Sequence, residues 1–215
     1  MPDKFSDLTD LSTTPPPKKK WYHLIPPSLR GLLFLVSIAW FIEIIDHIPG
    51  IELDAYGVIP RSISGLIGIP LMPFLHGNFS HLISNTFPFL ILGFIVQRAE
   101  KKHFFFVNLI IALLCGAGTW LIGRHSVHIG ASGVVYGYFG YVMIRAFMER
   151  NFTWILTGLA IGFFYGSMIF GALPSYNQTI SWEGHLCGMV AGIWIGRRKS
   201  IKIKALKNVN TLPEF

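Results

Sequence analysis

The stretch GHLCGMVAGIWIG, residues 184–196, places a glycine at every fourth position of an apolar segment, with His185 beside the first of them. Small residues four apart share one helix face and let two membrane helices approach almost backbone to backbone. A second apolar segment opens with Gly130-Ala131-Ser132-Gly133 and continues to Tyr136 and Gly137. The two segments together predict a helix pair that brings a serine and a histidine together inside a bilayer, where burial of either side chain without a role is costly.

Composition places the chain among integral membrane proteins. It has 215 residues, a mean hydropathy of +0.51, 52% hydrophobic residues and only 13% charged ones. That is too apolar for an ordinary soluble domain, so the lipid bilayer is an expected partner. The formal net charge of +7 does not indicate nucleic-acid binding, because the basic residues form short clusters between apolar runs, as topology signals do. Two cysteines alone allow no disulfide framework.

Six apolar runs predict an all-α membrane protein, a bundle of six transmembrane helices. The runs cover residues 29–45, 81–96, 104–122, 132–147, 152–170 and 184–195. The connection between the first and second helices, residues 46–78, contains four prolines and several glycines, so we expect a long irregular loop at the interface. The domains expected are a disordered cytoplasmic tail (1–20), a six-helix domain (21–200) and a short basic cytoplasmic tail (201–215).

The distribution of positive charge predicts that both termini are cytoplasmic. With the N-terminus inside, only Arg61 and Arg124 of the 18 lysines and arginines fall on the outer side, and an odd number of spans would spoil this asymmetry. We expect His125 and His128, in the outer connection after Arg124, to be solvated. The compact six-span form and the lack of a targeting peptide favour a multi-pass protein of a bacterial inner membrane. Residues 1–20 contain three aspartates, which argues against a mitochondrial presequence.

Three polar residues are predicted to lie at one depth. Ser132, His185 and Asn85 each precede a basic cytoplasmic anchor by 12 or 13 residues. A rise of ~1.5 Å per residue puts all three about 18–20 Å above the cytoplasmic edge of a hydrocarbon core roughly 30 Å thick. A water-filled cavity above that level would explain why several helices are short, since irregular backbone at membrane depth is tolerated where it lines such a cavity.

Ser132 and His185 suit nucleophilic catalysis. A serine hydroxyl becomes a good nucleophile when a neighbouring base takes its proton, and histidine is mostly neutral at pH 7. Glu183 lies two residues from His185 and should point to another face, so a two-membered dyad is the simplest proposal. Tyr136 is one turn along from Ser132 on the same face and could pack under the imidazole.

Donors for an oxyanion are available in two places. Ser132 is expected to begin a helix, where backbone N–H groups lack partners. His81 and Asn85 are four residues apart, share a helix face and can both donate hydrogen bonds. His76 lies in the preceding loop, where it could close the cavity or brace the turn.

Structural and metal-binding alternatives exist for the same residues. The glycine ladder could be a packing face only, and His81 with Asn85 could be an interhelical hydrogen-bonded cluster. A zinc site formed by His76, His81 and His185 is the metal alternative, but the two-histidine helix signature with its glutamate is absent. We therefore expect no metal and no cofactor.

The motifs resemble those of the rhomboid intramembrane serine proteases. The resemblance rests on GASG at residues 130–133 with Tyr136 and Gly137, on GHxxGxxxG at residues 184–192, and on the block from His76 through His81 to Asn85. It covers roughly residues 29–197 and implies a six-helix bundle that cleaves transmembrane protein substrates near their outer ends, without a cofactor. The site residues that it implies are Ser132 as nucleophile, His185 as general base, an oxyanion hole of His81, Asn85 and the Ser132 backbone N–H, and supporting positions His76, Tyr136, Gly130, Gly133 and Gly188.

One feature departs from the family pattern. Many members carry a Trp-Arg pair in the first long loop, whereas this chain has residues 56–61, YGVIPR, there. The departure bears on how the loop lies in the membrane and leaves the dyad unaffected. Two other functions compete with the protease: a catalytically silent rhomboid-like protein that binds transmembrane clients, and a small transporter or channel, for which no matched repeat is evident.

Overall fold

The computed structural model describes residues 26–174 and 180–209. These residues form helices, joined by loops that contain one antiparallel β-bridge between Val58 and His128. The long helices are α1 (Pro27–Asp46), α3 (Phe79–Glu100), α4 (Phe104–Ile122), α5 (Ser132–Glu149), α6 (Phe152–Tyr165) and α8 (Trp182–Val209). The short ones are α2 (Gly68–Leu71), α7 (Met168–Gly171) and 3₁₀ turns at Leu53–Tyr56, Ser64–Leu66, Met72–Phe74 and Lys101–His103.

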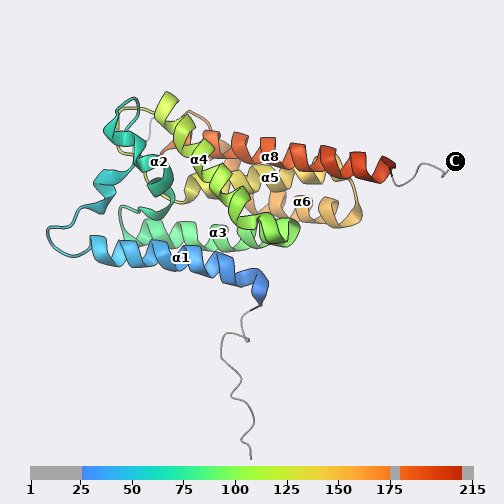
Figure 1. Ribbon diagram of the computed structural model, residues 1–215, viewed down its shortest axis with the longest axis horizontal. Helices are drawn as coiled ribbons and strands as arrows, with labels where there is room; N and C mark the ends of the chain where they lie inside the picture. The colour runs from blue at the N-terminus through green and yellow to red at the C-terminus, as the bar shows by residue number, and fades with distance from the viewer. Residues whose placement is uncertain (1–25, 175–179, 210–215) are drawn as a thin grey trace, which may run out of the picture.

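Helix α5 is the centre of the bundle. It packs against α8, α3, α6 and α4, while α1 packs on α3 at the edge of the molecule (Figure 1). Every residue of α5 from Gly133 to Val142 is buried. Because neighbouring helices surround α5, the position of its first turn in the bundle is fixed.

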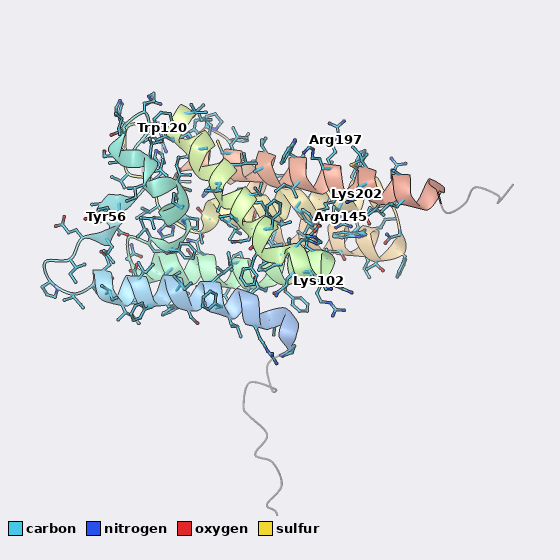
Figure 2. All side chains as sticks on the ribbon, in the orientation of Figure 1. Tyr56, Lys102, Trp120, Arg145, Arg197 and Lys202 are labelled. Atoms are coloured by element: carbon cyan, nitrogen blue, oxygen red, sulfur yellow. The ribbon has the colours of Figure 1, made fainter. Side chains whose placement is uncertain are left out.

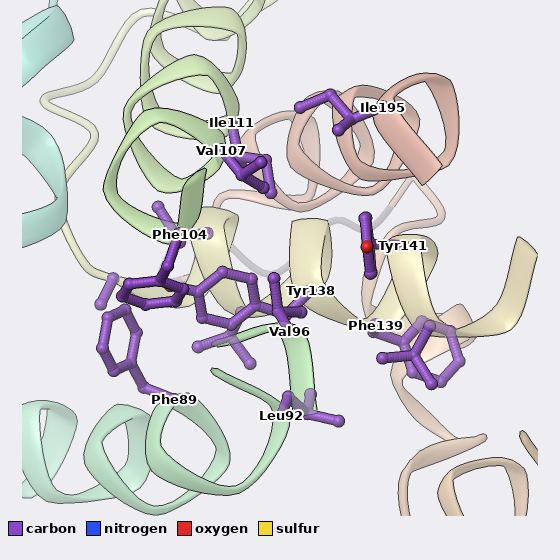
Figure 3. Close-up of a cluster of buried hydrophobic side chains, with 14 of the residues drawn as sticks. Phe89, Leu92, Val96, Phe104, Val107, Ile111, Tyr138, Phe139, Tyr141 and Ile195 are labelled. Carbon is purple, nitrogen blue, oxygen red and sulfur yellow. The ribbon is translucent and has the colours of Figure 1, made fainter. Parts of the chain in front are cut away.

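The apolar core lies where α3, α4, α5 and α8 meet. Tyr138 of α5 lies beside the rings of Phe89 and Phe104, with ring centroids 5.4 Å and 6.4 Å away (Figure 3). Val107 and Ile111 of α4 extend this cluster towards α8. Phe163 and Phe164 of α6, in contrast, are more than 70% exposed, as expected of side chains that face lipid.

One helical stretch among the described residues is long and apolar enough, by length and composition, to cross a membrane. It is Phe79–Ile122, which comprises α3 and α4. Helix α6 is apolar but has only 14 residues, and α8 carries several basic residues. The six-span count therefore stays a prediction, whereas the helical character of the bundle is confirmed.

Two predicted boundaries differ from the structure. The fifth run, expected over 152–170, is split into α6 and α7 at Gly166, because the chain turns before the short α7. The sixth run continues as α8 to Val209, well into the stretch expected to be a tail. Lysine, alanine and leucine, all good helix formers, favour this extension.

The long loop between α1 and α3 is attached to the end of α4. The Arg61 guanidinium donates to the carbonyls of Leu121 and Gly123, and the Trp120 indole donates to the carbonyl of Ser62. Tyr56 and Trp120 thus lie at one end of the bundle, and Lys102, Arg145, Arg197 and Lys202 lie towards the other (Figure 2). We call these the loop end and the basic end.

Candidate active site

Helices α5 and α8 are in backbone contact through their glycines. A Cβ atom added at Gly188 would overlap the carbonyl of Gly133, and one added at Gly192 would overlap the carbonyl of Gly137. Gly133 also faces the Cys115 sulfur, which leaves no room for a side chain there. This contact holds the first turns of the two helices at a fixed separation.

Ser132 and His185 meet at the top of this contact. Ser132 is the first residue of α5, His185 lies in the first turn of α8, and the Ser132 Oγ is 2.9 Å from the His185 Nε2. The His185 Nδ1 is 2.9 Å from the carbonyl oxygen of Gly171. A carbonyl can only accept, so Nδ1 carries the proton and Nε2 is left to accept from the serine hydroxyl.

Tyr136 forms a flat support for the histidine. Its ring lies parallel to the imidazole of His185, at a centroid distance of 4.1 Å and an interplanar angle of 7°. Gly171 packs directly against the Tyr136 hydroxyl, which a Cβ atom at position 171 would overlap. The imidazole is thus held by a stacked ring and by a hydrogen bond.

Helix α3 contributes His81 and Asn85 to the cavity that Ser132 and His185 also line. The Asn78 side chain caps α3 by accepting the N–H of His81 at 2.8 Å. Asn85 is buried, and its Nδ2 donates to the backbone carbonyl of His81 at 3.0 Å. The His81 ring lies against Gly130, since a Cβ on Gly130 would be 2.9 Å from the His81 Nε2.

Gly130 also needs its own backbone geometry. Its φ of +113° lies in a region that residues with a side chain rarely adopt, and its N–H donates to the carbonyl of Met72 at 2.9 Å. This turn leads directly into Ser132, where the first backbone N–H groups of α5 have no intrahelical acceptor.

His76 braces this turn. Its Nε2 accepts the N–H of Ala131 at 3.2 Å, its ring lies 5.1 Å from the His81 ring, and its side chain is buried. Burial, together with the nearby His81, lowers the pKa of His76 to about 4. His76 therefore stays neutral at pH 7 and keeps the lone pair that the Ala131 N–H requires.

These side chains line one cavity at the loop end of the bundle. Its volume is about 540 Å³, and Ser132, His185, His81, Asn85 and Tyr136 all contribute to its wall. Such a volume can hold an extended segment of polypeptide together with water. The arrangement therefore places a serine, a hydrogen-bonded base and several donors around one accessible space.

The expectation that His128 is solvated was wrong. Its side chain is only 2% exposed, its Nδ1 is 2.6 Å from the Ser181 Oγ, and its Nε2 is 3.0 Å from the carbonyl of Arg124. Its backbone forms the bridge to Val58. The neighbouring His125 is exposed. His128 thus joins the long loop, the α4–α5 connection and the start of α8 into one wall of the cavity.

An ion pair between a partly exposed arginine and a buried glutamate belongs to the same wall. Glu183 is fully buried and accepts from the Arg124 Nε at 2.7 Å and from the Arg124 backbone N–H at 3.2 Å. Sequence reasoning missed this pair, although Arg124 is one of only two basic residues expected on the outer side. Glu183 turns away to Arg124, so the hydrogen bond at the His185 Nδ1 goes to a carbonyl and not to a carboxylate.

Within the described residues, no group of three or more His, Cys, Asp or Glu side chains could hold a metal ion. His76 and His81 lie near each other, but each serves the turn or the helix described above.

Comparison with known proteins relates the chain to one family. The sequence model of the Rhomboid domain matches residues 64–200, which include every residue of the site. An uncharacterized protein of Mycobacterium bovis is 38% identical over 170 residues, 75% of this chain and 71% of the relative. A protein of Mycobacterium leprae is 31% identical over 191 residues, 84% of this chain and 76% of the relative. The chloroplastic rhomboid-like protein 11 of Arabidopsis thaliana is 30% identical over 187 residues, 76% and 63% of the two chains.

Proposed function

Because the chain belongs to the rhomboid family of integral membrane proteins, we propose that it is a serine endopeptidase that hydrolyses peptide bonds of transmembrane proteins near the outer membrane face. The observation that supports this proposal most directly is the 2.9 Å contact between the Ser132 Oγ and the His185 Nε2 inside a cavity of about 540 Å³. A serine that only completed its own helix would need neither the imidazole nor the cavity.

The first half of the reaction is acyl transfer to Ser132. The His185 Nε2 takes the hydroxyl proton as the Oγ attacks the scissile carbonyl carbon, and the carbonyl oxygen becomes an oxyanion. The proton on Nε2 then passes to the leaving amine, so the C–N bond breaks and an ester on Ser132 remains. The second half repeats these steps with water, which His185 deprotonates, and releases the acid product with Ser132 restored.

The oxyanion needs donors at the place where its charge develops. The backbone N–H of Ser132, the Asn85 amide and the His81 imidazole border the cavity beside the serine. The Asn85 Nδ2 has two hydrogens and donates one of them to the His81 carbonyl at 3.0 Å, which leaves the other for an oxyanion. Asn85→Ala is expected to lower turnover by roughly 10²–10³. Ile91→Ala, at an exposed position of the same helix outside the cavity, serves as its control.

The test is covalent labelling by a fluorophosphonate probe. The purified full chain in detergent is expected to be labelled, whereas Ser132→Ala and His185→Ala are not, because only an activated serine attacks the phosphorus centre. Lack of labelling in a folded wild-type protein would contradict the proposal. It would favour a catalytically silent protein that binds transmembrane clients, since some family members are inactive.

A further inference from the structure

A second hollow lies far from Ser132, towards the basic end. It is a groove of about 440 Å³ between the first half of α4 and residues 194–202 of α8. Its wall combines apolar side chains with basic ones. The residues that matter here are Phe106, Ile110, Trp194, Arg198, Lys199 and Lys202.

The basic side chains of the groove outnumber the carboxylates that pair with them. The Lys199 Nζ is 2.7 Å from the Glu100 Oε2, and Glu100 also faces Arg145 at 3.6 Å. The Arg198 guanidinium lies 4.6 Å from the centroid of the Trp194 ring. Arg198 and Lys202 have no carboxylate within 4 Å among the described residues, so they give the groove an excess of positive charge.

Along α8, the charged and apolar residues of the groove lie at different depths. Lys202 is one helical turn beyond Arg198, and Trp194 is one turn before it, so the sequence of α8 runs from apolar to basic towards the end of the molecule. Helix α4 runs the opposite way, and Phe106 and Ile110 lie about 3 Å and 9 Å along it from its first residue. Phe106 is 63% exposed and Trp194 is 46% exposed.

We propose that this groove binds an anionic glycerophospholipid of the leaflet at the basic end. The phosphodiester headgroup would lie against Arg198 and Lys202, and one acyl chain would lie along Phe106, Ile110 and Trp194. Charge complementarity selects this occupant: basic pockets between membrane helices favour anionic headgroups, and the apolar wall matches a chain that a soluble anion lacks. A second copy of the protein would bring the same positive charge against it.

The binding test uses the intrinsic fluorescence of Trp194. The full chain in a neutral detergent is titrated with phosphatidylglycerol or phosphatidylcholine carrying identical brominated acyl chains, which quench nearby tryptophans. The quenching lost in a Trp194→Phe variant reports the groove. We expect half-maximal quenching at a roughly thirtyfold lower mole fraction of phosphatidylglycerol, from two cations near the lipid surface.

Variants distinguish lipid binding in the groove from a general attraction of anionic lipid to the positive charge of the basic end. Arg198→Gln with Lys202→Gln should abolish the preference for phosphatidylglycerol, and Lys202→Gln alone should reduce it. The control, Arg197→Gln with Lys204→Gln, removes the same charge from exposed positions of α8 outside the groove and should keep the preference. The unfolding midpoint of each variant establishes that it is folded.

Three results would overturn the proposal. Equal quenching by the two lipids would show that the groove does not select an anionic headgroup. An equal loss of preference in the control double variant would assign the effect to bulk charge. Displacement of the brominated lipid by inorganic phosphate at the same concentration would reassign the basic residues to a soluble anion.

Discussion

At the scale of single residues, the site orients its base with a neutral partner. The carbonyl of Gly171 fixes the proton on the His185 Nδ1, and the Tyr136 ring fixes the plane of the imidazole. A carbonyl stabilises the imidazolium less than a buried carboxylate would, because it carries only a dipole. Orientation by packing therefore carries more of the proposed mechanism here than it does in a triad.

His76 predicts a pH dependence of stability. Its pKa is about 4 in the folded protein and 6.5 as the ordinary value, so the folded state holds fewer protons between these limits. The contribution of neutral His76 to the free energy of unfolding is therefore fully present above pH 6.5 and is lost as the pH falls towards 4. Between pH 7.5 and 4.5 the loss should be about 2 to 3 kcal/mol, and His76→Gln, which keeps an acceptor for the Ala131 N–H, should remove most of it.

The measurement is chemical unfolding in detergent at several pH values for the wild type and the variant. His125→Gln is the control, because His125 is exposed in the loop after α4. The control should show the same pH dependence as the wild type. A pH dependence that is unchanged in His76→Gln would show that another group causes it.

At the scale of elements, the contact of α5 with α8 determines the site. Gly188→Ala puts a methyl group where the Gly133 carbonyl lies, so the helices must separate by a fraction of an ångström or more. Overpacking of this kind typically costs about 1–3 kcal/mol. Since Ser132 and His185 belong to these two helices, we also expect the rate of fluorophosphonate labelling to fall, even in the fraction that remains folded.

Gly162→Ala is the matched control for this substitution. Gly162 lies in α6, and a Cβ there would meet only the Met143 side chain at an ordinary distance of 3.8 Å. Its labelling rate and unfolding midpoint should stay at or slightly above the wild-type values, because alanine favours a helix over glycine. Equal effects of the two substitutions would argue against a special role for the α5–α8 contact.

The elements that the sequence predicts well are those with a strong local pattern. The four-residue glycine spacing of residues 184–196 predicts a close helix pair, and α5 and α8 form such a pair. The break at Gly166 and the course of the loop have no comparable signal, because they depend on contacts with distant residues such as the Arg61 bonds to the end of α4. His128 was misjudged for the same reason, since a loop histidine is polar whether it is solvated or paired.

At the scale of the whole molecule, charge and hydrophobicity are arranged along the bundle axis. The loop end carries the cavity, the Arg124–Glu183 pair and the Arg61 contacts. The basic end carries Lys102, Arg145, Arg197 and Lys202. Positive residues favour the cytoplasmic side of a membrane. The cavity would then open towards the outer face, on the side where the proposed substrates are cut.

This orientation predicts which positions a membrane-impermeant thiol reagent reaches in intact cells. In a background with Cys115→Ser and Cys187→Ser, a cysteine in place of His125 should be labelled from outside, because His125 is exposed at the loop end. A cysteine in place of Lys204, exposed near the end of α8, should be labelled only after the membrane is opened. Fluorophosphonate labelling of each variant establishes that the site is intact. If Lys204→Cys reacts from outside and His125→Cys does not, the molecule lies the other way round, and the proposed cleavage of substrates near the outer face would be wrong even with an active Ser132.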